Sequence, residues 1–392
     1  MTRVLYLVEG PAPYGANRSL LSLVEYGLSH GIEPMVVGSR PGPFSEWLGV
    51  RGVPFKAIGH RFSIYPRTNT LVRKVFFAPI FTAFRIINAV ALLKLVLICR
   101  SFRPDIIHTN IGPIAIGSLA ARLMGIRHVW HLREYQDLDF GMKFFPSKSA
   151  FERLLARSAR VICVTQAIAE HFGLPANATV ISNGVASGNA AVLNMPKADY
   201  FLFVGRLEPA KQAAQVIEAY LNHVATASNP LRLLIAGDGD LAYIADLKSI
   251  AADAPSTARI EFLGFRNDTD FLMQNARAII VASDNEGFGR ITAEAMFNGC
   301  LVIGKATGGT ADILDAHQDE PLGLLFNTSS ELASQLDFAA EMSPEMYETK
   351  VRHAQHKAIA RYSTELYGAK VLEVYARLGD QSEFETQDGL MK

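Results

Sequence analysis

The chain has 392 residues, of which 49% are hydrophobic and 19% charged, and its 38 Lys and Arg balance 38 Asp and Glu. This composition excludes a disordered chain, which needs low hydrophobicity and high net charge, and the length favours two domains over one. The three cysteines form no CxxC pattern or Cys/His cluster, so the sequence predicts neither a disulfide framework nor a zinc site, and a reducing cytosol is expected.

The zero net charge hides an asymmetry between the two halves of the chain. Residues 1–190 contain 21 Lys and Arg against 10 Asp and Glu, whereas residues 191–392 contain 17 against 28. Halves of opposite sign indicate two domains. The basic first half indicates an anionic partner such as phospholipid, nucleic acid or an acidic substrate, although opposite charges could also simply help the halves to dock.

Short apolar runs alternate with helical patterns along the first half. The run at 4–8 is too short for a signal-peptide core and predicts a buried first strand. Strands separated by helices predict a parallel, doubly wound sheet. The further strands predicted are 34–38, 105–108, 128–131, 160–164 and 179–181, and the helices are 17–30, 115–124 and 167–172.

The pattern restarts after a linker at 186–198. The fold class predicted is therefore α/β, with two Rossmann-like doubly wound parallel-sheet domains that face an inter-domain cleft, because ligands of such sheets bind beyond the carboxyl ends of the strands. Strands are predicted at 200–204, 231–236, 260–263, 278–281 and 301–303, and helices at 209–227, 241–253, 291–298 and 344–378. The predicted domains are 1–187 and 188–363, followed by a helix at 364–380 and a polar tail at 381–392.

A cationic motif follows the first strand of the second half. In the sequence VGRLEPAK, residues 204–211, a strand ends, a glycine turns the chain, and Arg206 and Lys211 follow. Two cations beside helix N–H groups make a site for a diphosphate. Taken alone, the motif could equally be two surface cations.

An acidic motif, DNEGFGRITAE at residues 284–294, follows the strand at 278–281. Carboxylates such as Glu286 and Glu294 suit a polyhydroxyl ligand, because each oxygen accepts hydrogen bonds from vicinal hydroxyls. Glycines between them let backbone amides approach a ligand closely. The alternative is an acid near a helix dipole and a solvated helix residue, and spacing alone does not decide.

Taken together, these motifs are specific, and the chain resembles the retaining GT-B glycosyltransferases of family 4 over about residues 3–378. The resemblance implies an enzyme that moves a sugar from a nucleoside diphosphate sugar to an acceptor hydroxyl, without a metal or other cofactor, in polysaccharide or lipopolysaccharide assembly. It also implies that the helix at 364–380 packs back on the first domain. It rests on VGRL…K at 204–211, AGDG at 236–239, FLGF at 262–265, the pair Glu286 and Glu294, Gly308-Gly309, SNGV at 182–185, DIIH at 105–108 and Gly15.

The resemblance assigns roles to individual residues. Arg206 and Lys211 correspond to the pair that neutralises the donor diphosphate, Glu286 to the acid that contacts the sugar, and Glu294 to the acid that holds the ribose. The implied catalytic residues are Arg206, Lys211, Glu286 and His131. The implied donor-binding residues are Gly205, Gly237, Phe265, Arg266, Gly287, Phe288, Gly289 and Glu294, and those on the acceptor side are Gly15, Asn17, His108, Arg133 and Glu134.

Some positions depart from the family's pattern. Ala16 follows Gly15 where many relatives have a second glycine, Gln212 follows Lys211 where glycine is frequent, and Asp312 replaces a glutamate. None of these changes removes a catalytic group. His131 ends a strand, where a histidine is often structural, but the charged residues Arg133 and Glu134 beside it favour a functional role.

Several competing functions are considered. The sequence GDGDLA at 237–242 fits a dinucleotide-binding motif, but it follows the second strand of its half, which argues against a dehydrogenase. The DxD spellings at 137–139 and 238–240 could belong to a metal-dependent GT-A transferase. The nearer alternatives are a GT-B-fold sugar-nucleotide epimerase and a catalytically silent sugar-nucleotide-binding protein. Neither a bound metal nor a nucleic-acid partner is expected.

Residues 71–103 are apolar and basic and contain no acid. Arg85 and Lys94 interrupt the apolar runs and Pro79 is expected to begin or kink a helix, so a transmembrane helix is not predicted. The segment is either a buried helical hairpin or an amphipathic element on anionic lipid. With the aromatic loop at Phe144 and Phe145, it predicts peripheral contact with the cytoplasmic face of an anionic membrane, beside a glycan or lipid-linked acceptor.

Overall fold

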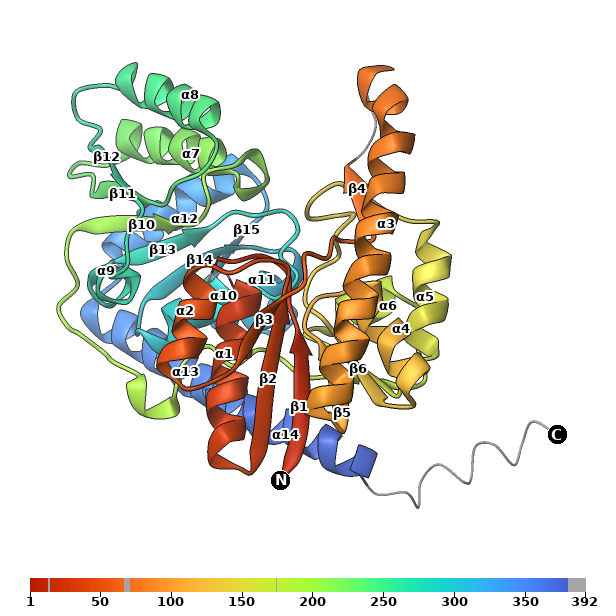
Figure 1. Ribbon diagram of the computed structural model, residues 1–392. Helices are drawn as coiled ribbons and strands as arrows, with labels where there is room; N and C mark the ends of the chain where they lie inside the picture. The colour runs from red at the N-terminus through yellow and green to blue at the C-terminus, as the bar shows by residue number, and fades with distance from the viewer. Residues whose placement is uncertain (13–14, 67–70, 174, 380–392) are drawn as a thin grey trace. The chain divides into compact units, whose positions relative to one another are not determined.

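The computed structural model describes residues 1–12, 15–66, 71–173 and 175–379, and it divides into two compact units (Figure 1). The first unit comprises Met1–Gly184 and the residues from Thr364 onward, and the second unit comprises Val185–Ser363. Each unit is built on its own parallel sheet with helices packed against it. The predicted α/β class with two Rossmann-like sheets is confirmed.

The described residues of the first unit form a sheet of seven parallel strands in the order β3-β2-β1-β5-β6-β8-β9. The chain moves outward from β1 to β3 and then returns to place β5 on the other side of β1. Ligands of doubly wound sheets bind where the strand order reverses, so the carboxyl ends of β1 and β5 mark the expected site. The strands are β1 (Thr2–Leu7), β2 (Ile32–Gly38), β3 (Phe55–Ala57), β5 (Ile106–Thr109), β6 (Arg127–Leu132), β8 (Arg160–Cys163) and β9 (Ala178–Val180).

Side chains alternate between the two faces along a strand, and helices cover both faces of this sheet. Val4 and Tyr6 of β1 pack in one core with α1 and α14, whereas Leu5 and Leu7 pack in a second core with α3 and α4. The helices are α1 (Gly15–Ser29), α2 (Pro43–Val50), α3 (Leu71–Phe102), α4 (Ala115–Met124), α5 (Lys148–Ala156), α6 (Gln166–His171) and α14 (Thr364–Gly379), and a small antiparallel pair joins β4 (Ile64–Pro66) to β7 (Met142–Phe144).

The second unit repeats this plan with a parallel sheet in the order β12-β11-β10-β13-β14-β15, so its strand order reverses between β10 and β13. The strands are β10 (Tyr200–Val204), β11 (Arg232–Ala236), β12 (Ile260–Gly264), β13 (Ala278–Val281), β14 (Leu301–Lys305) and β15 (Leu324–Phe326). The helices are η1 (Gly188–Ala190), η2 (Pro209–Lys211), α7 (Ala213–Thr226), α8 (Leu241–Ala252), α9 (Thr269–Asn275), α10 (Arg290–Phe297), α11 (Gly308–Ile313), α12 (Ser329–Glu341) and α13 (Pro344–Tyr362).

Three predicted helical segments differ from the structure. The helix expected at 209–227 is divided, because Gln212 adopts a left-handed conformation (φ 58°) between the η2 turn and α7. The helix expected at 344–378 is also divided, because Ser363 is extended between α13 and α14. Residues 71–102 form the single helix α3 and no hairpin, since no glycine breaks the run and Pro79 is accommodated within the helix.

The prediction that the aromatic loop at Phe144 and Phe145 faces a membrane is wrong for these two side chains. Phe144 is buried, with ring centroids 4.9 Å from Phe151 and 5.7 Å from Phe172. Phe145 packs on Phe81 of α3 at 4.0 Å. Both side chains therefore serve the packing of the first unit.

The C-terminal helix α14 belongs to the core of the first unit. Its Tyr367 and Tyr375 are buried, and Gly368 lets it approach α1 closely. A Cβ atom at Gly368 would lie 2.3 Å from Cγ of Tyr26. This contact requires glycine even though glycine weakens a helix.

We expect Gly368→Ala to destabilise the first unit by about 1–3 kcal/mol, because displacing Tyr26 outweighs the gain in helix propensity of about 1 kcal/mol. The control is Gly49→Ala in α2, where a Cβ atom has nothing within 4 Å and the change should be neutral or stabilising. Urea unfolding followed by tryptophan fluorescence checks this, since Trp47 and Trp130 are the chain's only tryptophans. Equal stability of Gly368→Ala and the wild type would contradict the packing argument.

Candidate active site

Two of the predicted catalytic residues meet where the sheet of the second unit reverses. Lys211 ends the η2 turn after β10, and Glu286 lies in the loop after β13. Because β10 and β13 are paired in parallel, their carboxyl ends lie at the same edge of the sheet. Nζ of Lys211 donates to Oε1 of Glu286 at 2.6 Å, and the two side chains are 26% and 20% exposed. The pair is therefore partly open to a ligand.

Arg206 lies in the same loop as Lys211. Its guanidinium pairs with Glu208 at 3.1 Å and is about half exposed. Both predicted cations are thus held by carboxylates of their own unit. An exposed pair of this kind contributes only about 0–1 kcal/mol, so an anionic ligand can replace the carboxylate at small cost.

The glycines at the ends of β10 and β11 allow a close backbone approach. A Cβ atom at Gly237, which has φ +151°, would lie 1.8 Å from the carbonyl oxygen of Gly205. The amide of Gly205 donates to Ala236 at 3.1 Å, and the amide of Gly237 donates to Gly264 at 2.8 Å. A side chain at position 237 would separate these loops.

Glycines also bring the loop after β13 against the N-terminus of α11. The amide of Gly309 donates to the carbonyl of Glu286 at 2.8 Å, and a Cβ atom at Gly309 would lie 2.2 Å from the carbonyl oxygen of Phe288. Gly289 has φ +85° and directly precedes α10. The Phe288 side chain is buried against Tyr362. The backbone around Gly287 is therefore held in place by close contacts.

Glu294 is buried in α10 and is held by a residue that the sequence argument missed. Nε of Arg290 donates to Oε1 of Glu294 at 2.6 Å. Nη2 of the same arginine donates to the carbonyl of Val185 at 3.0 Å. The signal was present in the sequence, because residues four apart are neighbours on a helix.

A second missed group lies next to the Lys211–Glu286 pair. Asp284 accepts hydrogen bonds from Lys305, which ends β14, and from Nε2 of Gln212 at 2.9 Å. Gln212, Asp284 and Lys305 help to line a hollow of about 590 Å³. The available signal was their position near the carboxyl ends of strands: Asp284 follows β13, and Lys305 is the last residue of β14.

Phe265 and Arg266 follow the edge strand β12, two strands away from β10. The Phe265 ring is 68% exposed. Arg266 is also exposed and forms a bidentate ion pair with Asp268 at 2.5 and 2.8 Å. These residues share the carboxyl edge of the sheet with Lys211, two strands away from it.

The first unit places Asn17 and Asn110 where its own sheet reverses. Gly15 begins α1, and Nδ2 of Asn110, just after β5, donates to the carbonyl of Ala16 at 3.1 Å. Nδ2 of Asn17 donates to Ala12 at 2.7 Å. Oδ1 of Asn17 is buried and has no hydrogen-bond partner among the described residues.

His131 lies at the carboxyl end of β6, and both it and Arg133 are buried within the first unit. Arg133 donates to Oδ1 of Asn110 at 2.8 Å, to the hydroxyl of Tyr367 at 2.8 Å and to Oδ1 of Asn183. These groups are neutral, so the buried guanidinium is held by amide and hydroxyl oxygens. Glu134 accepts instead from Gln136, at 2.8 Å.

His108 and His131 form a buried chain with the C-terminal helix. Nδ1 of His131 is 3.3 Å from Nε2 of His108, whose Nδ1 is hydrogen-bonded to the Tyr375 hydroxyl at 2.6 Å. Burial, followed by the charge of Arg133, holds the pKa of both histidines well below the usual value. Both rings are therefore neutral at physiological pH.

The two DxD spellings have structural partners. Asp137 pairs with His171 at 2.7 Å, and Asp139 accepts from the amide of Tyr135 at 2.9 Å. Asp240 caps α8 by accepting from the amide of Tyr243 at 2.8 Å. Across the part of the chain that the structure describes, no group of three His, Cys, Asp or Glu could hold a metal ion.

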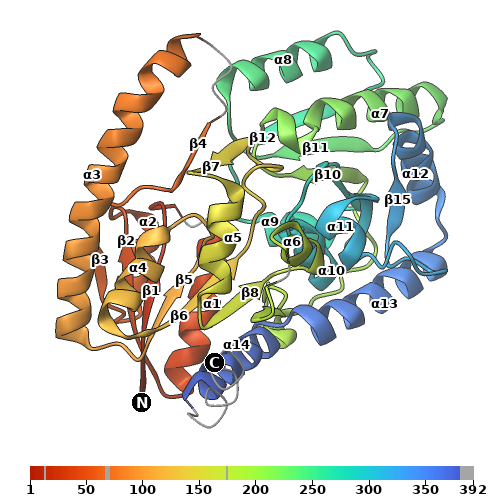
Figure 2. The ribbon, with the colours of Figure 1, turned by 90° about the vertical axis from the view of Figure 1, so that its right-hand side faces the viewer.

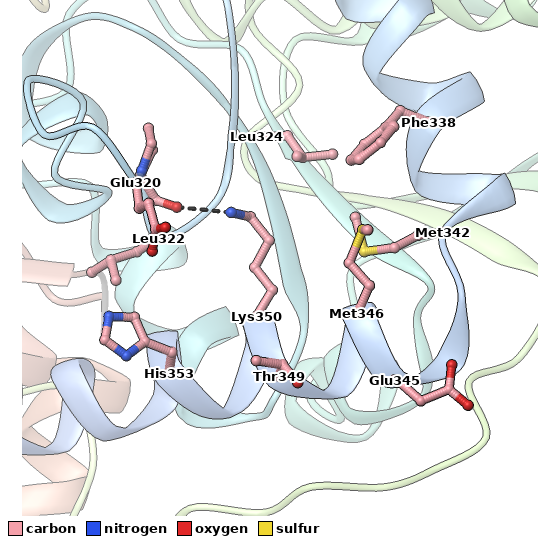
Figure 3. Close-up of a pocket in the computed structure, with 11 residues that line it drawn as sticks. Glu320, Leu322, Leu324, Phe338, Met342, Glu345, Met346, Thr349, Lys350 and His353 are labelled. Atoms are coloured by element: carbon pink, nitrogen blue, oxygen red, sulfur yellow. Dashed lines mark hydrogen bonds between the residues drawn. The ribbon is translucent and has the colours of Figure 1, made fainter.

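A separate hollow of about 520 Å³ lies beside α13, and Figure 3 shows its lining. Phe338, Met342 and Met346 supply an apolar wall, and Nζ of Lys350 donates to the carbonyl of Pro321 at 2.9 Å. None of the predicted site residues lines this hollow. Lys211 and Glu286 lie instead at the carboxyl edge of the sheet.

Comparison with known proteins adds independent findings. The family model described as "Glycosyl transferases group 1" matches residues 190–357, and the model described as "Glycosyltransferase Family 4" matches residues 13–187. The chain is 23% identical to Arabidopsis thaliana sulfoquinovosyl transferase SQD2 over 395 residues, which are 93% of this chain and 70% of SQD2.

Two solved structures share the fold over almost their whole length. Anabaena HepE in complex with UDP-glucose has a TM-score of 0.77 and 21% identity, covering 96% of this chain and 100% of HepE. A glycosyltransferase from Rickettsia africae has a TM-score of 0.76 and 17% identity, covering 97% and 99%. At these identities the likeness shows the fold.

We expect the buried histidines to make the first unit sensitive to acid. Burial lowers the pKa of His128 to about 3, whereas an unfolded histidine titrates near 6.5. Below pH 6.5 the unfolded chain therefore binds protons that the folded chain refuses, so stability is complete above this pH and falls as the pH drops toward 3. Each such histidine contributes about 1.4 kcal/mol per pH unit.

His128→Gln tests this expectation, because a glutamine can still bond Thr109 and Ser158, the partners of the ring at 2.8 and 3.2 Å. Unfolding followed by tryptophan fluorescence at pH 7.5 and 5.5 should show a smaller loss of stability for the variant. His317→Gln, at an exposed position, is the control and should keep the wild-type slope. A wild-type slope for His128→Gln would show that the ring does not carry the effect.

Proposed function

We propose that this chain, which belongs to the family 4 glycosyltransferases, transfers a sugar from a nucleoside diphosphate sugar to an acceptor hydroxyl and retains the anomeric configuration. The family models that match both halves of the chain make it a glycosyltransferase of GT-B type. The observation that carries the finer proposal is the Lys211–Glu286 pair where β10 and β13 diverge. The pair places a cation that can bind phosphate next to a carboxylate that can accept hydrogen bonds from sugar hydroxyls.

The cations would bind the donor diphosphate. Lys211 and Arg206 follow the same strand, and both are paired with exposed or partly exposed carboxylates. When the diphosphate leaves the sugar, negative charge grows on it, and fixed cations stabilise that charge more than they stabilise the bound donor. Glu286, released from Lys211, would then accept hydrogen bonds from the sugar.

Glu294 would hold the ribose of the nucleotide. Its carboxylate is buried and fixed by Arg290, so it is already oriented before a ligand arrives. Backbone amides around Gly289 would cradle the phosphate, and the backbone near Phe265 would meet the base. We propose UDP as the nucleotide, because Anabaena HepE, with the same fold, is described in complex with UDP-glucose.

Retention would follow from attack on the same face of the sugar that the diphosphate leaves. No protein nucleophile is needed in this scheme, because a donor phosphate oxygen takes the proton of the acceptor hydroxyl as the new bond forms. The protein would orient the groups and stabilise charge, and the exposed start of α1 at Gly15, beside the carboxyl end of β1, would border the acceptor. The two cations take the part that a metal ion plays elsewhere, so we propose metal-independent transfer.

The acceptor in this proposal is a glycan or a lipid-linked glycan in polysaccharide or lipopolysaccharide assembly. We place the enzyme in the cytoplasm, where nucleotide sugars are made, in peripheral contact with an anionic membrane. A sugar-nucleotide epimerase would consume the donor without any acceptor, and a silent binding protein would bind it without turnover. An assay of sugar transfer with mixed nucleotide sugars separates these functions.

We expect Lys211→Met to lower the rate of UDP release from the UDP-sugar by about 10²–10³-fold, the usual cost of losing one donor that stabilises the transition state. The assay contains EDTA, because the proposal needs no metal ion. The control is Lys248→Met, which removes an exposed lysine from α8 of the same unit. Wild-type turnover by Lys211→Met would refute the diphosphate assignment.

We expect Glu294→Gln to weaken UDP binding by about tenfold or more, because a charged hydrogen bond to a hydroxyl contributes about 1.5–3 kcal/mol. Glu286→Gln should bind UDP normally and lose discrimination of the sugar. Calorimetry with UDP and with the UDP-sugar separates the two roles, and Glu261→Gln on the exposed side of β12 is the control. Unchanged UDP affinity in Glu294→Gln would exclude its ribose role.

A further inference from the structure

Helix α3 presents an apolar face to solvent along most of its length. Ile86, Val90, Leu93 and Leu97 are 62%, 48%, 67% and 61% exposed. Their alternating spacing of three and four residues places them on one side of the helix. The same side includes exposed Pro79, Ile80, Ala83 and Ile87. Soluble proteins rarely leave a continuous apolar stripe of this length uncovered.

The opposite face of α3 is fixed to the first unit. Ala91, Leu95 and Cys99 are buried in the core beneath the sheet. The side chain of Asn88 bonds the backbone amide and carbonyl of Arg61 at 2.7 and 3.0 Å, and Phe81 packs on Phe145. In Figure 2, α3 runs along the margin of this unit, and no other element of the unit covers its outer side. The apolar stripe is therefore a surface of the folded unit.

The charges around the stripe all have one sign. No Asp or Glu occurs between Glu46 and Asp105, an interval that contains ten Lys and Arg. Lys94 is exposed within the stripe, and Arg85 and Arg100 are exposed beside it. Long basic side chains can direct their charge toward lipid headgroups while their methylenes cover apolar surface. The apolar stripe with basic side chains therefore matches the surface of an anionic bilayer, which has an apolar interior and negatively charged headgroups.

Two other occupants fit less well. The segment Pro79–Phe102 is long and apolar enough to cross a bilayer. A single spanning helix would be surrounded by lipid, whereas Ala91, Leu95 and Cys99 of α3 are buried in the core of the first unit. In a pair of copies, the basic side chains of one α3 would meet those of the other without an acid to balance them.

We propose that the outer face of α3, from Ile86 to Leu97, is a membrane-binding surface that takes an anionic phospholipid bilayer, with the helix parallel to the membrane plane. On α4, which packs beside α3, Leu123 is 68% exposed next to exposed Arg122, and this helix widens the surface. The proposed function enters this inference at one point only: membrane binding through α3 would hold the transferase beside a lipid-linked acceptor.

The test is co-sedimentation with vesicles of 30% phosphatidylglycerol in phosphatidylcholine, without donor or acceptor, so that failure here leaves the transferase proposal intact. The full chain should pellet with these vesicles at low salt, more weakly at 0.5 M NaCl, and little with pure phosphatidylcholine. Leu93→Glu combined with Leu97→Glu should weaken binding by roughly tenfold or more. Val50→Glu, at an 86% exposed position of the same unit, is the matched control and should bind as the wild type does.

The fold of each variant is checked by its unfolding midpoint and by UDP affinity, which the substitutions should leave unchanged. The proposal is overturned if the wild type ignores anionic vesicles, binds neutral vesicles equally well, or keeps its binding in the double variant. It is also overturned if the wild type resists carbonate extraction, which would mean a spanning helix. A dimer of the wild type that the double variant converts to a monomer would assign the stripe to a second copy instead.

Discussion

The proposed chemistry of this chain depends on the point at which each parallel sheet reverses its strand order. Neighbouring strands on the two sides of that point send their following loops in opposite directions, so backbone groups and side chains can meet a ligand between them. In the second unit, the loops after β10 and β13 bring Lys211 and Glu286 within 2.6 Å. In the first unit, the loops after β1 and β5 are tied by Asn110 and Ala16.

The charged groups at these two places are held in different ways, and the difference suits different tasks. Lys211 and Arg206 are partly exposed and paired with carboxylates, and the proposed binding of the donor diphosphate would exchange these pairs for phosphate contacts. Arg133 is buried among neutral oxygens of Asn110, which follows β5, of Asn183 and of Tyr367 in α14. Removing one of its partners would leave a buried charge poorly solvated, so this guanidinium is suited to joining distant segments of the first unit.

The order of the elements was largely predictable from the sequence. Apolar runs of four or five residues separated by helical patterns predicted parallel sheets, and the cationic and acidic motifs fell directly after strands, as ligand-binding residues do. Element ends were less accurate where one residue changed the backbone, as at Gln212 and Ser363. Local pattern cannot predict such a change, because the same residues are compatible with a continuous helix. Arg290 was overlooked although its spacing from Glu294 signals an ion pair.

The sequence by itself determined the fold class, the two repeats of the doubly wound pattern and the identity of the charged residues at the strand ends, because these follow from periodicity and from the residues themselves. Tertiary structure decided which of them meet and which are exposed. It buried Phe144 and Arg133, which the sequence had marked as an aromatic loop and a charged residue, and it turned the apolar side of α3 outward, although the segment at 71–103 was equally compatible with burial. Exposure depends on what packs against a segment, and that partner is contributed by residues far away in the chain.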